Sequence, residues 1–214
     1  MNKHVQMNYL SWSGCASIAP RAITLICAPY FFNLLGTSGM GHVSSALALA
    51  TFISILITFQ QQSYIQVNLP SASPSLRTTL VYDAIIICSI MTLIILLCAV
   101  FLKNSLISLI GMNLQVFFMV IVCSIWLSIS QILYAVLQFK RNFKKIFFLS
   151  FFFIGSSQLL SLIALSFLFE KNWEIVISIQ ALVSLGFVLC HFNMYKLLDL
   201  YTLKIKYINF KSVI

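Results

Sequence analysis

Charged side chains are scarce in this sequence. Only 8% of its 214 residues are Asp, Glu, Lys or Arg, and only four are acidic. Soluble domains are roughly a quarter charged. A soluble chain of this size also has too little interior to hide a composition that is 61% hydrophobic. These two facts exclude an ordinary soluble domain and favour an integral membrane protein.

Turn-forming residues and paired cysteines are also lacking. The chain has seven Gly and four Pro, and no segment alternates with the period of two that a membrane β-barrel strand shows over about ten residues. The six cysteines stand singly in or beside apolar runs, which is not typical of a metal site or a disulfide framework. No phosphate-binding glycine loop occurs, so we expect no nucleotide and no other cofactor. The predicted fold class is an all-α integral membrane protein.

Long apolar runs are what the sequence has instead. Six of them approach the roughly 20 residues that cross a bilayer core of about 30 Å. We therefore expect a six-helix membrane lobe over residues 13–195, after an N-terminal segment of residues 1–12 and before a basic tail or inter-lobe linker of residues 196–214. The expected spans are Ser13–Leu35, Val43–Ile65, Thr79–Leu102, Val116–Leu137, Ile146–Leu168 and Trp173–Tyr195.

The net charge of +9 is concentrated between these runs. With both termini in the cytoplasm, ten Lys and Arg residues fall on the inner side, and only Lys103 and Lys171 fall on the outer side. This split follows the positive-inside rule and indicates anionic membrane lipids, not nucleic acid, as partners. The densest group is expected at the lipid head-group surface and comprises Lys140, Arg141, Lys144 and Lys145.

Arg21 is unusual because it falls inside the first apolar run. The stretch from Ala22 to Leu35 covers roughly 21 Å of helix, which is too short to cross the bilayer, so the span must begin before Arg21. One interpretation is a side chain that snorkels toward the inner interface. The other, slightly favoured, is a cation that faces a water-filled cavity, because intramembrane charges usually face a bundle interior.

Other polar residues are expected near the depth of Arg21. Asp83 lies about one turn inside the third span, and a run of glutamines closes the second span, while His191 and Asn193 end the sixth. We therefore predict a polar vestibule open to the cytoplasm. Arg21 would be its cation, and its possible polar partners would be Asp83, Gln60, Gln61 and His191.

The order of these segments resembles the N-terminal half of an O-antigen polysaccharide flippase of the Wzx type, in the MOP exporter superfamily. The resemblance rests on the helix "PRAITLICAPYFFNLLG", the loop "TSGMG", the helix "HVSSALALATFISILITF" and the later stretch "QILYAVLQFKRNFKKIFFLSFF". It covers roughly Ala19 to Tyr195 and consists of pattern and order, without an invariant catalytic motif.

The resemblance implies a transporter, not an enzyme, that moves undecaprenyl-pyrophosphate-linked oligosaccharide across the bacterial inner membrane. It also implies that Arg21 corresponds to a cavity cation of the family, since Arg offers a forked donor set to a pyrophosphate. Family members have two lobes and are about twice as long. Three readings follow: a truncated product, one half of a split transporter, or a lobe that forms a homodimer.

Two other functions fit the same composition. A six-span chain of this length also suits the substrate-binding membrane subunit of a vitamin importer, which would have its pocket near the outer surface. That half of this sequence is the less polar, so the importer ranks second. A membrane scaffold without transport activity remains a third alternative.

Overall fold

The computed structural model describes residues 3–101, 113–167 and 172–192, and every element in these ranges is a helix. The helices are α1 (Lys3–Thr58), α2 (Gln61–Asn68), α3 (Pro74–Phe101), α5 (Leu114–Phe139), α6 (Phe143–Phe167) and α7 (Trp173–Phe192). Five of them are long and apolar enough to cross a membrane. The prediction of an α-helical chain with membrane-spanning helices is thus confirmed at this level.

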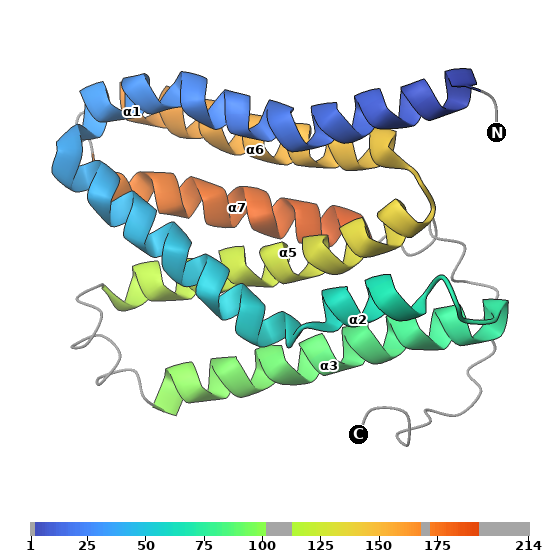
Figure 1. Cartoon of the computed structure of the whole chain (residues 1–214). Coiled ribbons are helices and arrows are strands. Elements are labelled where there is room, and N and C mark those ends of the chain that lie inside the picture. Colours follow the sequence, from blue (N-terminus) through green and yellow to red (C-terminus); the bar gives the residue numbers. More distant parts are fainter. Residues whose placement is uncertain (1–2, 102–112, 168–171, 193–214) are drawn as a thin grey trace.

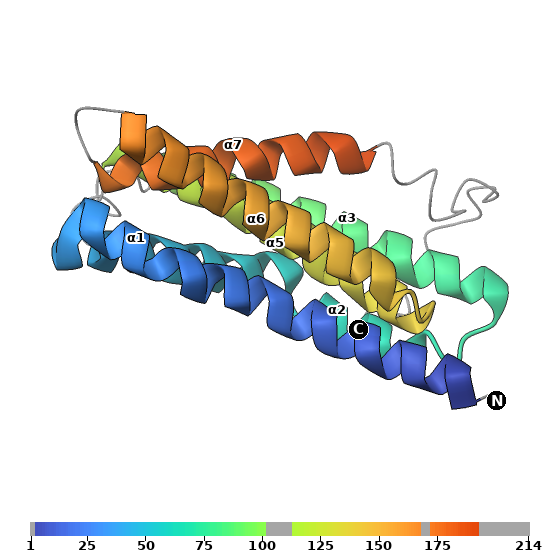
Figure 2. The ribbon, with the colours of Figure 1, turned by 90° about the horizontal axis from the view of Figure 1, so that it is seen from above.

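The helices run along a common axis and form one elongated bundle (Figures 1 and 2). One end, here called the Lys140 end, holds the N-terminus of α1, the start of α3 and the turn between α5 and α6 (Figure 1). The opposite end, called the Gly36 end, holds the start of α7 and the bend in α1.

The first two predicted spans both lie within α1, which folds back on itself at Gly36 (Figure 1). Gly36 has a φ of 69° and a ψ of 179°, a conformation that needs the freedom of glycine. The first half of α1 (residues 3–35) packs mainly on α6, and the second half (residues 37–58) on α5. At the bend, the ring of His42 stacks on Trp173 at 5.1 Å, which joins this turn to the start of α7.

Two sequence-based boundaries need correction. The first helix begins at Lys3 instead of Ser13, so most of the expected N-terminal segment is helical. The second span does not continue to Ile65, because α1 ends at Thr58 and the short helix α2 follows. The remaining spans lie within a few residues of their predicted limits. Leu102, Leu168, Tyr195 and the tail of residues 196–214 lie outside the described residues.

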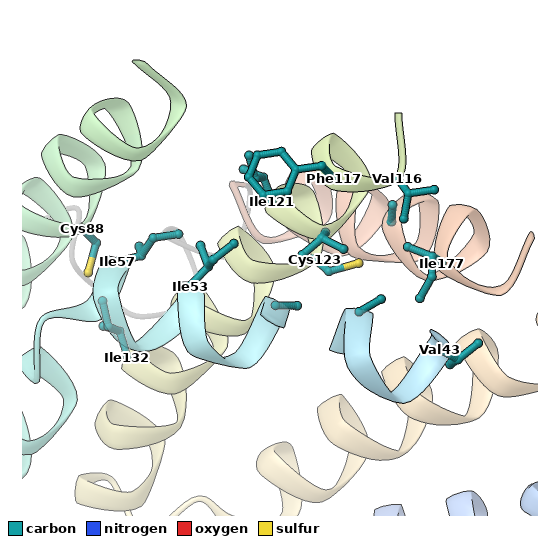
Figure 3. Packing of buried hydrophobic residues seen from close by; sticks show 14 of the residues in the cluster. Val43, Ile53, Ile57, Cys88, Val116, Phe117, Ile121, Cys123, Ile132 and Ile177 are labelled. Atoms are coloured by element: carbon teal, nitrogen blue, oxygen red, sulfur yellow. The ribbon is translucent and has the colours of Figure 1, made fainter. Parts of the chain in front are cut away.

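Helix α5 is the centre of the bundle, because it packs against all the other described helices. Trp126 is 1% exposed and lies between Phe153 of α6 and Phe187 of α7, with ring centroids 5.3 Å away in both pairs. Figure 3 shows further apolar residues of α5, among them Ile121 and Ile132, in the same buried cluster as Ile53 and Ile57 of α1. The helix therefore buries apolar side chains on more than one face.

Small residues let α1 and α5 approach closely. Ala46, Ala50 and Ser54 of α1 recur every four residues and are fully buried. On α5, Ser124 and Ser128 are likewise fully buried, and the Ser128 hydroxyl donates to the Ser54 carbonyl oxygen at 3.3 Å. Interfaces of small residues are the usual way in which membrane helices pack without a hydrophobic driving force. These five residues are called the small-residue seam.

The seam predicts a position-specific loss of stability. Ala50→Leu inserts three carbon atoms where no space is left, and overpacking of this kind costs about 1–3 kcal/mol. Ala48→Leu is the matched control, since Ala48 is exposed on the same helix. Unfolding in mixed micelles measures both. Equal stability of the two variants would contradict the close α1–α5 contact.

Candidate functional site

The helix break between α1 and α2 is the main irregularity among the described helices. Phe59 and Gln60 have φ values of 43° and 61°, in the left-handed region. Each such residue costs roughly 1–2 kcal/mol in a chain of L-amino acids. No Gly or Pro occurs between His42 and Leu69, so neither of the usual helix breakers causes the break. The surrounding packing must hold this conformation.

Buried residues fix the chain on both sides of the break. Ile57 and Thr58 close α1, while Ile65 and Leu69 anchor α2 and the residue after it. All four side chains are buried, and Ile65 is 0% exposed. The two helices are thus held independently, and the two residues between them take the conformation that joins them.

Polar contacts hold α2 against the neighbouring helices. The Gln66 amide donates to the Gln138 side-chain oxygen at 2.9 Å, which ties α2 to the last turn of α5. The Arg77 Nε donates to the Leu69 carbonyl oxygen at 3.1 Å, and the guanidinium lies 4.9 Å from the Phe139 ring centroid. Arg77 therefore links the start of α3 to the end of α5 and to the residue that directly follows α2.

A cavity of about 330 Å³ opens at the break. Its walls come from the end of α1, the start of α2 and the middle of α5, and we call it the glutamine cavity. It is lined by Ile55, Thr58, Gln60, Gln62, Ser63 and Gln131. Five of the six side chains are polar and none is charged. Gln131 lies eight positions before the end of α5, which is about 12 Å along the helix, so the cavity lies in the half of the bundle nearer the Lys140 end.

The amides of this cavity differ in their hydrogen bonding. The Ser63 hydroxyl donates to the Gln60 side-chain oxygen at 3.4 Å. The side chains of Gln62 and Gln131 have no hydrogen-bond partner within the described part of the chain. No side chain caps the N-terminus of α2 either. The cavity thus presents amide donors and acceptors that are free to bind water or a ligand.

The structure gathers only part of the predicted vestibule. Gln60 and Gln62 line the cavity, whereas Gln61 is half-buried beside it and is not part of the lining. His191 lies in the last turn of α7, but its side chain is outside the described set, and Asn193 is outside it altogether. Gln131 was not predicted, although a lone glutamine within an apolar run was a usable signal.

Arg21 and Asp83 do not join the glutamine cavity. Arg21 is exposed on the first half of α1, and Asp83 is half-buried on α3. In Figure 1 these two helix segments lie on opposite sides of the bundle, with α5, α6 and α7 between them. The described structure accordingly shows no ion pair between Arg21 and Asp83. The sequence predicts a similar depth for both residues along the bundle axis. It does not predict that the helix segments carrying them lie on opposite sides of the bundle.

The basic residues of the α5–α6 turn do gather at one end. Lys140, Arg141, Lys144 and Lys145 are all exposed there, and the Lys144 ammonium lies 5.9 Å from the Trp12 ring centroid. Asn142 caps α6 by accepting the Lys145 N–H at 3.3 Å. This turn therefore presents a compact cationic surface beside an aromatic side chain of α1.

Comparisons with known proteins add no name to this site. No family model, curated protein or solved structure matches the chain.

The strain at the break predicts an unusual gain from glycine. Gln60→Gly removes the left-handed penalty, so we expect the free energy of unfolding to rise by about 1 kcal/mol. The control Gln62→Gly lies in regular helix and should lower it by about 0.5–1 kcal/mol. Thermal unfolding of the purified variants measures both. A loss of stability in Gln60→Gly as large as that in Gln62→Gly would contradict the left-handed conformation.

Proposed function

We propose that this chain is a membrane transporter that exports lipid-linked oligosaccharide, as one lobe of a polysaccharide flippase. The observation that carries the proposal is the glutamine cavity at a strained helix break in an otherwise apolar bundle. Transporters characteristically build substrate sites from discontinuous membrane helices, because irregular backbone is tolerated where it lines a cavity. The resemblance in segment order supports the same assignment.

The charge distribution supports a cytoplasmic position for the Lys140 end. Arg77 and the four basic residues of the α5–α6 turn lie at this end, where an anionic inner leaflet would attract them. A bacterial inner membrane with both termini inside is the localisation that this proposal requires. The glutamine cavity would then lie in the cytoplasmic half of the bundle, on the side where a lipid-linked substrate is made.

Arg21 keeps its proposed role as a cation for the pyrophosphate, although not within the glutamine cavity. Its guanidinium is exposed on the first half of α1, at roughly the depth of a bilayer interior. A two-lobed assembly, made with a second lobe or a second copy of this chain, would enclose such a residue between its halves. A forked cation in that position suits a pyrophosphate.

The position of the cavity also discriminates against the vitamin importer. A capture subunit takes its substrate from outside and needs a pocket at the outer end. The glutamine cavity lies instead nearer the Lys140 end, the end that the basic residues assign to the cytoplasm. We therefore rank export above import.

Orientation can be tested by labelling single cysteines. In a chain with its six native cysteines replaced, Thr37→Cys at the Gly36 bend should react with a membrane-impermeant maleimide added to intact cells. Lys145→Cys should react only after the cells are opened, because the basic turn would be inside. The reverse labelling pattern would place the glutamine cavity toward the outside and favour the importer.

Transport can be tested in cells that lack their own polysaccharide flippase. We expect the chain to restore surface polysaccharide, and the double variant Gln62→Leu with Gln131→Leu to reduce it at least about tenfold, since two hydrogen-bonding groups are lost. Gln158→Leu on α6 is the matched control, being a half-buried glutamine outside the cavity. Immunoblots of membranes establish equal amounts. Wild-type chain that inserts normally but restores nothing would exclude a homodimer that transports by itself, and would leave only a lobe that needs a separate partner.

A further inference from the structure

We infer that the glutamine cavity binds one neutral sugar residue of the substrate, and that the charged head group is held elsewhere on the protein. The sugar as ligand rests on the proposed function. The preference for a neutral, hydroxyl-rich group rests on the cavity alone.

The chemistry of the lining selects a neutral ligand. A glutamine amide offers two donors and one acceptor oxygen, and a Ser or Thr hydroxyl both donates and accepts. Sugar hydroxyls have the same double character, so each can be satisfied by these groups. A pyrophosphate would find no cation among the six lining side chains, so it would gain no charge-assisted hydrogen bond from them.

The free amides favour a ligand over an internal role. Gln66 and Gln138, close by, satisfy each other at 2.9 Å. Gln62 and Gln131, by contrast, face the cavity with no side-chain partner among the described residues. Their amides stand on two different helices, α2 and α5, and can therefore approach one ligand from two sides.

The size of the cavity limits what it can hold. A volume of about 330 Å³ is at the lower end of the roughly 300–1,000 Å³ found for small-molecule sites. It suits a single sugar residue and not a whole oligosaccharide. Ile55 adds an apolar surface to the polar lining, as small-molecule sites usually have.

The cations of the protein lie away from this cavity. Arg21 is exposed on the first half of α1, a segment that Figure 1 shows on the side of the bundle away from α2, and the exposed cations Lys140, Arg141, Lys144 and Lys145 lie in the turn between α5 and α6. Arg77 is engaged with the Leu69 carbonyl and the Phe139 ring. A lipid-linked substrate would therefore meet its charge contacts and its sugar contacts at different places.

Binding of simple glycosides to the purified full chain tests the inference. The probes are the methyl glycosides of glucose, galactose, mannose and N-acetylglucosamine, with inorganic pyrophosphate as the competitor, followed by ligand-observed NMR. We expect at least one glycoside to bind in the millimolar range and pyrophosphate not to displace it. Gln62→Leu and Gln131→Leu should each weaken binding about five- to tenfold, as expected for one lost hydrogen bond, and Gln158→Leu by less than about twofold.

Three results would overturn the inference: no glycoside binds, pyrophosphate displaces the bound glycoside, or the two cavity variants bind as tightly as wild type. Circular dichroism of each variant excludes misfolding as the cause of a loss, and Gln131→Asn should retain part of the affinity. The outcome is separable from that of the transport assay. Restored export without glycoside binding would reject this inference alone, whereas glycoside binding without restored export would exclude a homodimer that exports by itself and leave the neutral site standing.

Discussion

Every backbone amide in a membrane interior needs a partner, and this constraint determines where the chain can bind anything. The long helices satisfy it internally along their length. Phe59 and Gln60 interrupt that pattern, and no side chain caps the first turn of α2 that follows. Polar side chains and a hollow of about 330 Å³ occur at the same point. The break and the polar side chains around it therefore occur at one place in the bundle.

The small-residue seam between α1 and α5 positions the residues that line the glutamine cavity. Ser54 and Ser128 bring the backbones of α1 and α5 together through a hydroxyl–carbonyl contact of 3.3 Å. Thr58 lies one turn beyond Ser54 on α1, and Gln131 lies one turn beyond Ser128 on α5. Residues three or four apart share a helix face, so the seam that buries serines continues directly into the glutamine cavity. The close contact between the two helices thus positions an amide from α5 opposite the end of α1.

Hydrophobic runs predicted the helices well, because length and composition suffice to identify a span. The same runs also predicted the approximate depth of each polar residue in the membrane, because depth follows from the number of residues between it and the end of its helix. They could not give the direction in which each residue points. Arg21 and Asp83 share a depth, but the helix segments that carry them, the first half of α1 and α3, lie on opposite sides of the bundle (Figure 1). The break escaped prediction for another reason: a run of glutamines is compatible with helix, and only tertiary anchors such as Ile57 and Ile65 force the left-handed residues between them.

The separation of charged from neutral polar groups bears on the kind of substrate that such a bundle can handle. A cavity that combined Arg21 with the glutamines would suit a small anion, which binds through its charge and needs little else. Here the free amides are uncharged and the cations are exposed on other surfaces. A ligand that uses both sets must be large enough to reach from one to the other, and must carry neutral hydroxyls as well as phosphate. Lipid-linked oligosaccharide, the substrate class proposed above, carries neutral hydroxyls and a pyrophosphate at separate places on one long molecule, which matches the separate positions of the amides and the cations.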